Sequence, residues 1–313
     1  MPAPRDRAAL IKAARMYFLD GRSQDDVARE LGTSRSNVSR MLSAARAQGI
    51  VEIRVHDQIS REKDLEDALQ ERFGLSHVRV AAFRPGVDGL VAAGDLAAQW
   101  LDESLQDGQV LGLSWGASLQ AMVDSFSADQ PRSVEIVPLI GGLATVMSLV
   151  SGEELVRELA GRLGATYRYL HAPALLRSKT ARDALLEEPT VAEVLERAQT
   201  ADIAMVGIGT AGIGSSNEVI DGLGLSANER KDFLAGEPVG DTCCRFFDAD
   251  GRQVLGAVND RVLAIELDQL RRIPTVIGVA AGVEKAQGVL GALRGGLVDG
   301  MIADASLALA LLS

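Results

Sequence analysis

The 313-residue chain contains very little cysteine and histidine. Its only two cysteines are the neighbours Cys243 and Cys244, and adjacent cysteines rarely form a bridge. A disulfide-stabilised secreted domain is therefore excluded, and we expect a reducing compartment. The three histidines, His56, His77 and His171, are scattered without the spacing of metal ligands, so we expect no metal site and no cofactor.

Long apolar runs are also missing. No stretch of eighteen consecutive apolar residues occurs, and the opening segment "MPAPRDRAAL" is polar. These absences argue against a transmembrane helix and a signal peptide, so we expect a cytoplasmic protein. Aromatic residues make up only 4% of the chain while glycines number 32, a composition that suits an α/β protein with many tight turns.

The net charge of −11 is unevenly distributed along the chain. Residues 1–55 carry ten Lys/Arg and six Asp/Glu, a balance of +4, whereas the remainder carries 22 and 37, a balance of −15. A positive first segment on a strongly negative protein suits a molecule that contacts phosphates at one end only.

The segment "DDVARELGTSRSNVSRML", residues 25–42, has the pattern of two short helices joined by a tight turn. Apolar residues three and four positions apart define one face of each helix. Between them Gly32 can take the left-handed conformation that ends a helix, while small Ala28 and β-branched Val38 let the two helices interlock. This combination is the signature of the DNA-binding helix-turn-helix; an ordinary helical hairpin with a solvated polar face is the alternative.

The second of these helices would present its polar side chains to DNA. Arginine can read guanine and asparagine can read adenine, while serine donates to phosphates or bases. Ser23 is expected to cap the first helix, and Thr33 or Ser34 the second. The predicted DNA-binding residues are Ser23, Gln24, Thr33, Ser34, Arg35, Ser36, Asn37, Ser39 and Arg40.

Charge and periodicity divide the chain into three parts. We predict a helix-turn-helix domain over residues 1–55, whose last stretch, 49–55, alternates like a strand and could begin a wing. Residues 56–75 are predicted to form a linker helix, because 60–75 is charged and amphipathic; the first helix of the second domain is the alternative. Residues 76–313 are predicted to form one large domain.

From residue 76 onward, short apolar runs alternate with helical stretches, which is typical of a mostly parallel sheet covered on both faces. Ligands of such sheets bind at the carboxyl ends of strands, in loops that lead to helices. Three of these loops are rich in small residues, at 112–119, 138–142 and 206–217. In the first, a helix N-terminus offers free amides and Trp115 could cover a sugar ring; a turn kept small for packing is the alternative.

The loop 206–217 also matches the dinucleotide-binding pattern Gly-x-Gly-x-x-Gly through Gly207, Gly209 and Gly212. We expect no helix after it, and no acidic residue follows at the required distance, so a ligand-contacting loop is favoured over nucleotide binding. Lys285 opens a later helix, where a positive charge is unfavourable unless an anion lies nearby. Lys285 is therefore a candidate phosphate or carboxylate contact, with a solvated surface lysine as the alternative.

These motifs together resemble one family. The helix-turn-helix at 23–48, "GLSWG" (112–116), "PLIGG" (138–142), "ADIAMVGIGT" (201–210) and the long C-terminal segment 271–304 look like those of the SorC family of sugar-binding transcriptional regulators. The resemblance covers essentially the whole chain. It implies a repressor or activator of sugar, polyol or sugar-phosphate catabolism that binds duplex operator DNA.

The resemblance also implies an architecture and a ligand site. The fold class would be α/β: an all-α helix-turn-helix domain followed by a Rossmann-like α/β effector domain of the ribose-phosphate isomerase and glucosamine-phosphate deaminase type. Residues 76–313 would then bind the effector and form a homo-oligomer, a dimer or tetramer. The implied effector-binding residues are Ser114, Trp115, Gly116, Ala117, Ser118, Gly141, Gly142, Gly207, Gly209, Thr210, Arg245, Asp260 and Lys285.

Two points leave the effector and the activity open. Residues 137–149 contain no basic residue, which leaves a free sugar or polyol possible, although the lack of anionic partners for Arg245 and Lys285 favours a phosphorylated sugar. We expect no catalytic residues, because Asp202 begins a strand and His171 has no evident carboxylate partner. A sugar-phosphate isomerase or deaminase is the alternative function, and a sigma-factor-like protein is disfavoured by the large second domain.

Overall fold

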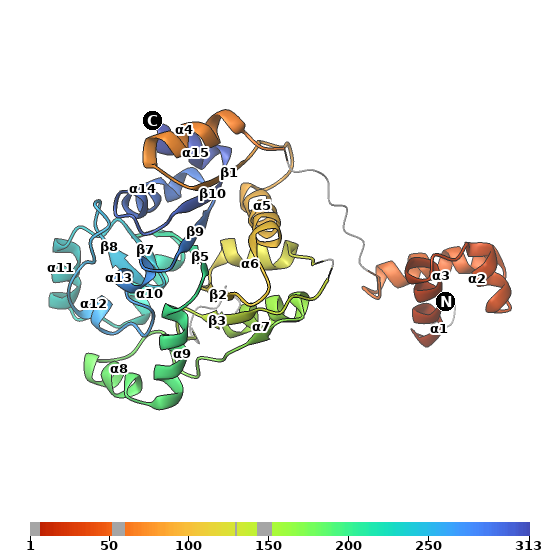
Figure 1. Ribbon diagram of the computed structural model, residues 1–313, viewed down its shortest axis with the longest axis horizontal. Coiled ribbons are helices and arrows are strands. Elements are labelled where there is room, and N and C mark those ends of the chain that lie inside the picture. Colours follow the sequence, from red (N-terminus) through yellow and green to blue (C-terminus); the bar gives the residue numbers. More distant parts are fainter. Residues whose placement is uncertain (1–6, 52–59, 129, 143–151) are drawn as a thin grey trace. The chain divides into compact units, whose positions relative to one another are not determined.

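The computed structural model describes residues 7–51, 60–128, 130–142 and 152–313. The chain separates into two compact units, residues 1–58 and 59–313 (Figure 1). Within the described residues, no helix has the length and apolar character needed to cross a membrane.

The first unit is a small helical bundle. Its elements are α1 (Arg7–Ala14), the π-helical turn η1 (Arg15–Leu19), α2 (Gln24–Glu30) and α3 (Arg35–Ala47). Val38 is fully buried and Ala28 nearly so, and together with residues of α1 they form the core of this unit. The predicted strand over 49–55 falls largely outside the described residues.

The turn between α2 and α3 has the predicted geometry. Gly32 has a φ of +61°, and the amide of Thr33 donates to the carbonyl of Ala28 at 2.9 Å. The side chains of Ser23 and Ser34 each accept a hydrogen bond from the amide three residues later, at 3.2 Å in both cases. The predicted helices, turn and caps of the helix-turn-helix are thus confirmed as local structure.

The second unit contains a seven-stranded parallel sheet in the order β1-β10-β9-β5-β2-β3-β4. The strands are β1 (His77–Ala81), β2 (Val110–Leu113), β3 (Glu135–Pro138), β4 (Thr166–Tyr167), β5 (Ile203–Gly207), β9 (Thr275–Ala280) and β10 (Gly300–Asp304). The predicted α/β class with a mostly parallel sheet is confirmed. A second, antiparallel sheet that the sequence analysis did not predict consists of β6 (Gly209–Thr210), β7 (Gly240–Thr242) and β8 (Arg245–Phe247).

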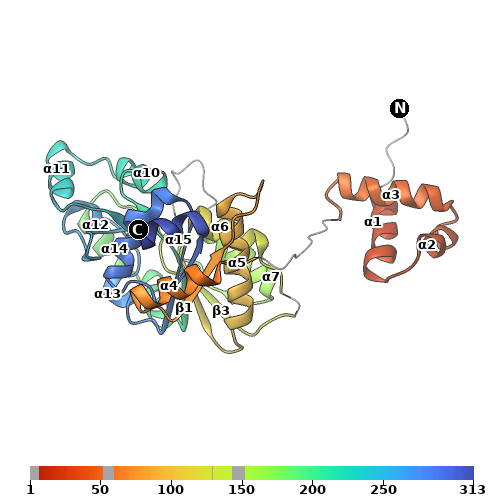
Figure 2. The same cartoon turned by 90° about the horizontal axis from the view of Figure 1, so that it is seen from above.

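Helices cover both faces of the large sheet, as the nearly continuous apolar strands require. In β5, Ile203 and Met205 pack on one face and Ala204 and Val206 on the other, following the two-residue period of a strand. The first face is covered by α5 (Gly89–Ser104), α6 (Ala117–Ser125) and α7 (Gly152–Leu163), which lie together in Figures 1 and 2.

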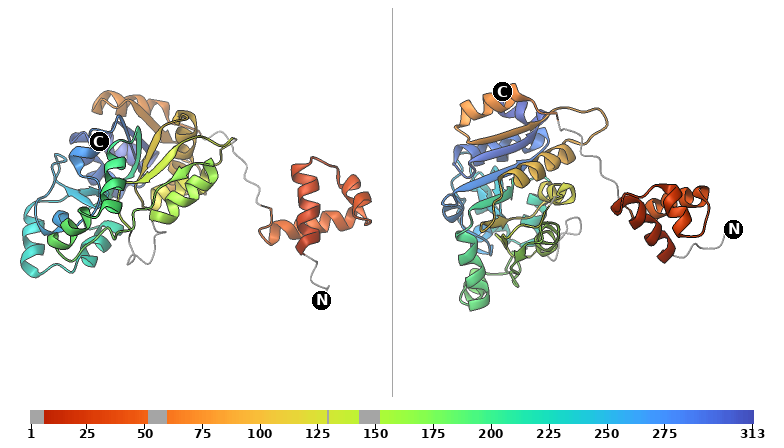
Figure 3. Two further views of the ribbon diagram at one scale, coloured as in Figure 1. Left: turned by 60° about the horizontal axis from the view of Figure 1, so that its bottom comes forward. Right: turned by 45° about the vertical axis from the view of Figure 1, so that its right-hand side comes forward.

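The opposite face carries the antiparallel sheet and the remaining helices. These are α4 (Lys63–Phe73), α8 (Lys179–Leu186), α9 (Pro189–Gln199), α10 (Ser215–Gly222), α11 (Ala227–Ala235), α12 (Ala257–Asp260), α13 (Leu267–Leu270), η2 (Val283–Lys285), α14 (Ala286–Arg294) and α15 (Ala305–Leu312). Helix α4 lies against β1 and α15, so that the C-terminus is beside it in both views of Figure 3. Its contacts are those of the first helix of the second unit, the alternative to a linker helix.

Helix α14 lies unusually close to the antiparallel sheet because of Gly288. A Cβ atom at Gly288 would lie 2.1 Å from the carbonyl oxygen of Gly209, which belongs to the backbone and has little room to move. Alanine normally stabilises a helix interior relative to glycine by about 1 kcal/mol. Here we expect the reverse: Gly288→Ala should lower the free energy of unfolding by about 1–3 kcal/mol through overpacking.

The matched control for this prediction is Gly161→Ala in α7. No atom lies within 4 Å of a Cβ at Gly161, so this variant should gain roughly 0.4–1 kcal/mol from the reduced entropy of the unfolded chain. Urea unfolding of both variants checks the pair. Equal shifts of the same sign would contradict the close approach of α14 to the antiparallel sheet.

Candidate functional site

A cavity of the second unit lies where the strand connections diverge. Strands β5 and β2 are parallel neighbours, yet the chain leaves β2 toward α6 on one face and leaves β5 toward β6 and α10 on the other. Such a switch point opens a crevice at the carboxyl ends of the strands, where ligands of α/β sheets bind. A cavity of about 500 Å³ occupies it. Its lining includes Asp88, Gly89, Leu90, Trp115, Gly116, Ala117, Ser118, Gly207, Ile208, Gly209, Ser215, Asp241, Cys243, Cys244, Ala281, Gly282, Glu284, Lys285, Asp304 and Ser306.

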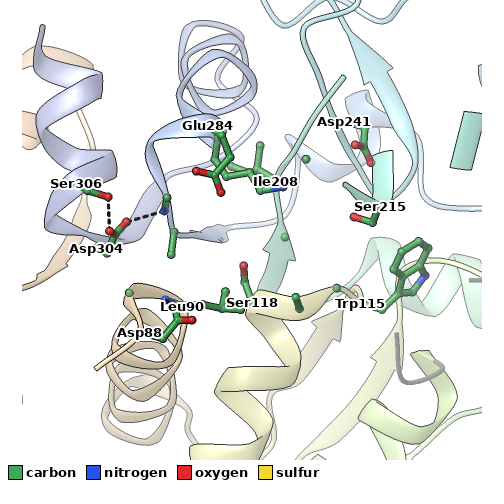
Figure 4. Close-up of a pocket in the computed structure, with 18 of the residues that line it drawn as sticks. Asp88, Leu90, Trp115, Ser118, Ile208, Ser215, Asp241, Glu284, Asp304 and Ser306 are labelled. Atoms are coloured by element: carbon green, nitrogen blue, oxygen red, sulfur yellow. Dashed lines mark hydrogen bonds between the residues drawn. The ribbon is translucent and has the colours of Figure 1, made fainter. Parts of the chain in front are cut away.

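The N-terminus of α6 forms one wall of this cavity. Gly116 precedes the helix with a φ of +131°, which disfavours other residues, and no side chain caps the first amides. Ala117 and Ser118 line the cavity, and the Ser118 hydroxyl points into it (Figure 4). The uncapped amides at this position suit an anion or the hydroxyl groups of a ligand.

Ser114 connects two of the loops that end at the cavity. Its side chain is buried, and its Oγ accepts a hydrogen bond from the amide of Gly207 at 3.2 Å. This bond joins the loop after β2 to the loop after β5. Ser114 therefore positions the cavity wall and does not belong to the lining that the structure describes.

Asp241 places a buried carboxyl at the cavity wall. Its Oδ1 accepts a hydrogen bond from the hydroxyl of Ser216, and a Cβ at Gly209 would lie 2.1 Å from both of those oxygens. Only glycine at position 209 therefore permits the pair. Burial raises the pKa of the Asp241 carboxyl, against the opposing effects of the Ser216 hydrogen bond and the positive charge of Lys285.

The cavity is rich in carboxylates. Asp88 caps α5 through the amide of Leu90 at 2.8 Å, and Asp304 accepts a hydrogen bond from the amide of Gly282 at 2.9 Å. Figure 4 shows Asp88 and Asp304 on one side of the view, Trp115 and Asp241 on the other, and Glu284 between these two sides. The lining that the structure describes thus holds the carboxylates of Asp88, Asp241, Glu284 and Asp304 and, as its one cation, Lys285.

The structure brings many of the predicted effector-binding residues together. Those that line the cavity are Trp115, Gly116, Ala117, Ser118, Gly207, Gly209 and Lys285. Trp115 is half-buried, and its Nε1 is buried with no hydrogen-bond partner. The expectation that no helix follows the loop 206–217 is wrong, because α10 begins at Ser215.

Arg245 was expected to contact the effector, and this prediction is wrong. The residue is 1% exposed, and its side chain donates to the carbonyls of Asn259 and Ala264 at 2.5 and 3.1 Å. It also forms an ion pair with Glu266 at 2.6 Å. Burial lowers the pKa of the guanidinium, and Glu266 opposes this shift. Arg245 thus crosslinks the segments around α12 and α13 and does not reach the cavity.

The other predicted positions that are absent from the described lining are held elsewhere. The amides of Gly141 and Gly142 donate to the carbonyls of Leu263 and Ala172 at 3.0 and 2.9 Å. The Thr210 hydroxyl is buried next to Gly288 on α14, and Asp260 lies at the end of α12. All four residues are therefore absent from the described lining; for Gly141 and Gly142 the reason is backbone pairing, and for Thr210 it is packing against α14.

Asp241, Asp88, Asp304, Glu284 and the two cysteines were missed by the sequence analysis. Asp304 directly follows the apolar run of β10, so a carboxylate at the carboxyl end of a parallel strand was a usable signal.

The expectation that His171 has no carboxylate partner is also corrected: His171 Nδ1 lies 4.0 Å from Glu153, but neither residue is part of the described lining. No group of metal-ligating side chains occurs among the residues that the structure describes.

In the first unit, the predicted DNA-binding residues fall into two groups. Arg35, Ser36, Ser39 and Arg40 are exposed on α3, and Arg35 lies 3.9 Å from Asp25 of α2. The others are engaged locally: Ser23 and Ser34 cap helices, Asn37 donates to the hydroxyl of Thr33 at 2.8 Å, and Gln24 is half-buried. The exposed group is free to reach a DNA groove.

Comparisons with known proteins agree with this geometry. Residues 57–313 match the family described as "Putative sugar-binding domain". The chain is 32% identical over 306 residues to the deoxyribonucleoside regulator of Bacillus subtilis (strain 168), covering 97% of this chain and 96% of that protein. It is 32% identical over 309 residues to the sorbitol operon regulator of Klebsiella pneumoniae, covering 96% of each. The crystal structure of full-length sorbitol operon regulator SorC from Klebsiella pneumoniae aligns with a TM-score of 0.74 and 31% identity over 98% of this chain and 99% of that one.

Proposed function

The chain belongs to the SorC family of sugar-binding transcriptional regulators, and we propose that it binds operator DNA through α3 and a small sugar, polyol or sugar phosphate in the cavity between β2 and β5. Occupancy of the cavity then alters the affinity for the operator. The observation that carries the proposal is the meeting of the uncapped α6 N-terminus, Lys285 and buried Asp241 in one cavity of suitable size.

The charges of the cavity limit the chemical classes of effector that we propose. Among the lining residues that the structure describes, one ammonium group faces four carboxylates (Asp88, Asp241, Glu284 and Asp304), so this part of the wall offers a single cationic site. With Arg245 engaged by Glu266, one reason to expect a phosphorylated sugar no longer holds. We therefore propose a polyhydroxylated ligand with at most one phosphate group, held by the α6 amides and Lys285.

A thermal-shift screen with free sugars, polyols, monophosphates and bisphosphates tests the proposed effector class. Lys285→Ala should weaken a monophosphate strongly and a neutral polyol little. A bisphosphate that binds best and keeps its affinity in this variant would contradict the single-cation site. Turnover assays on the same compounds address the alternative, an isomerase or deaminase; relatives of this chain are named as regulators.

Arg35 and Arg40 carry the next prediction. Operator sequences are first selected from a random DNA pool. Because we propose that Arg35 contacts a base, Arg35→Ala should bind these sequences about 1–3 kcal/mol more weakly and with relaxed specificity at one base pair. Arg29→Ala is the matched control, because Arg29 is also highly exposed and carries the same charge but pairs with Asp26 on α2. Gel shifts in which Arg35→Ala and Arg40→Ala both bind like the wild type would refute the assignment of the recognition helix.

We also propose a homo-oligomer, because one helix-turn-helix contacts few bases and operators usually offer two half-sites. The proposed surface includes α15, whose Leu309 is 59% exposed beside α4. Leu309→Glu should lower the mass measured by light scattering, whereas Leu234→Glu on α11, with the same 59% exposure, should not. A wild-type protein that is monomeric both alone and on DNA would rule the oligomer out.

A further inference from the structure

The turn between β7 and β8 contains the two cysteines in an unusual backbone conformation. Thr242 pairs with Arg245, so Cys243 and Cys244 form a two-residue hairpin loop. Their φ angles are +50° and +58°. Such turns favour Asn-Gly or similar pairs, since positive φ disfavours other residues. Strained residues of this kind concentrate at functional sites.

Both cysteines line the effector cavity. They are free, 6% and 2% exposed, and share the cavity wall with Asp241 and Ser118. They are poorly placed to form a disulfide with each other, because consecutive Cα atoms are only about 3.8 Å apart and disulfides usually need about 4.4–6.8 Å. The wall of the cavity therefore contains two neighbouring free cysteines, which also belong to the buried core of the unit.

The protonation of these thiols limits the classes of ligand that can bind to them. Burial raises the pKa of the Cys243 thiol to about 12, and the neighbouring charge of Asp241 adds to this; the pKa of the Cys244 thiol is raised as well, for the same reasons. Divalent soft metals bind thiolates, and two thiolates here would add negative charge to a buried, already acidic wall. A ligand whose two bonds to sulfur form with release of the thiol protons, and whose product is neutral, avoids this cost.

We propose that Cys243 and Cys244 together form a binding site for trivalent arsenicals inside the effector cavity. In the reaction with phenylarsine oxide, two As–S bonds form and the As–O bonds break. Both thiol protons leave with the oxygen as one water molecule. Arsenic stays trivalent and neither sulfur is oxidised, so no further reactant is needed. The bound group would occupy the part of the cavity next to Asp241, which would exclude a sugar ligand from it.

Phenylarsine oxide added to the folded full-length protein tests the proposal. Native mass spectrometry should show one phenylarsenic group per chain, with the loss of two hydrogens. Cys243→Ser and Cys244→Ser should each bind about 10²–10⁴-fold more weakly, because the second As–S bond of the wild type forms within one molecule. Excess 1,2-ethanedithiol should reverse the adduct, whereas a monothiol at the same concentration should not.

Tryptophan fluorescence locates the adduct without relying on the cysteine variants. Trp115 lines the cavity, whereas Trp100 lies on α5 and is buried in the core of the second unit. The arsenical should change the emission of the wild type and of Trp100→Phe but not that of Trp115→Phe. The proposal is overturned if only the denatured protein takes up the arsenical, if either single-cysteine variant binds as tightly as the wild type, or if the emission of Trp115 does not respond. None of these results depends on the identity of the effector.

Discussion

Replacing Arg245 by alanine is expected to reduce the free energy of unfolding by about 3–5 kcal/mol. The side chain is almost fully buried, and it supplies donors to the carbonyls of Asn259, Ala264 and Ile265 as well as the partner of Glu266. Its removal takes a donor from each of these carbonyls, removes the close ion-pair partner of Glu266 and leaves a space in the buried interior. The loss should therefore exceed that of an ordinary surface ion pair several-fold.

Urea unfolding followed by tryptophan fluorescence measures this loss in the second unit, because both tryptophans, Trp100 and Trp115, belong to it. Arg252→Ala is the matched control: Arg252 follows β8 and pairs with Asp250, but its side chain is 73% exposed, so the expected change is within about 0.5 kcal/mol. If the two alanine variants unfolded at similar urea concentrations, the role of Arg245 as a buried crosslink would be wrong.

Ser118→Glu is expected to abolish the response to the effector while DNA binding without effector is unchanged. Ser118 is the second residue of α6, where a carboxylate is favourable for the helix itself, so the variant should fold. The new charge would lie at the uncapped amides and compete for Lys285. Because coupling between two binding sites is typically about 1–3 kcal/mol, the lost effect should be roughly a 5–150-fold change in operator affinity.

Ser118→Gln separates charge from bulk, since its side chain has nearly the same size and no charge. For a phosphorylated effector, the glutamine variant should keep part of the response that the glutamate variant loses. For a neutral polyol, both variants should impair binding to a similar extent. Operator titrations with and without the ligand found by thermal shift give the measurement. A normal response in Ser118→Glu would place the effector site elsewhere.

Local patterns in the sequence sufficed for the helix-turn-helix and for the fold class. Gly32, with its positive φ, and the caps at Ser23 and Ser34 depend on residues a few positions apart, so their conformation could be predicted from spacing alone. The alternation of strands and helices likewise indicated a parallel sheet, and two of the three predicted loops at its carboxyl edge, 112–119 and 206–217, contribute residues to the cavity. The helix N-terminus at Ala117 and Ser118 and the position of Lys285 at the cavity were foreseen in the same way.

The other residues of the cavity wall, and the partners of the buried charges, could be found only from the tertiary structure. Arg245 sits in a three-residue strand next to the two cysteines, and nothing nearby in sequence reveals that Glu266 and three distant carbonyls surround it. Asp241 reaches the cavity because β6 and β7 pair antiparallel outside the main sheet, an arrangement that depends on contacts between distant segments. Sequence periodicity shows which face of a helix or strand is buried. The partner of a buried charge depends instead on packing between segments that are distant in sequence. For this reason only the tertiary structure shows that Lys285 faces the cavity and that Arg245 does not.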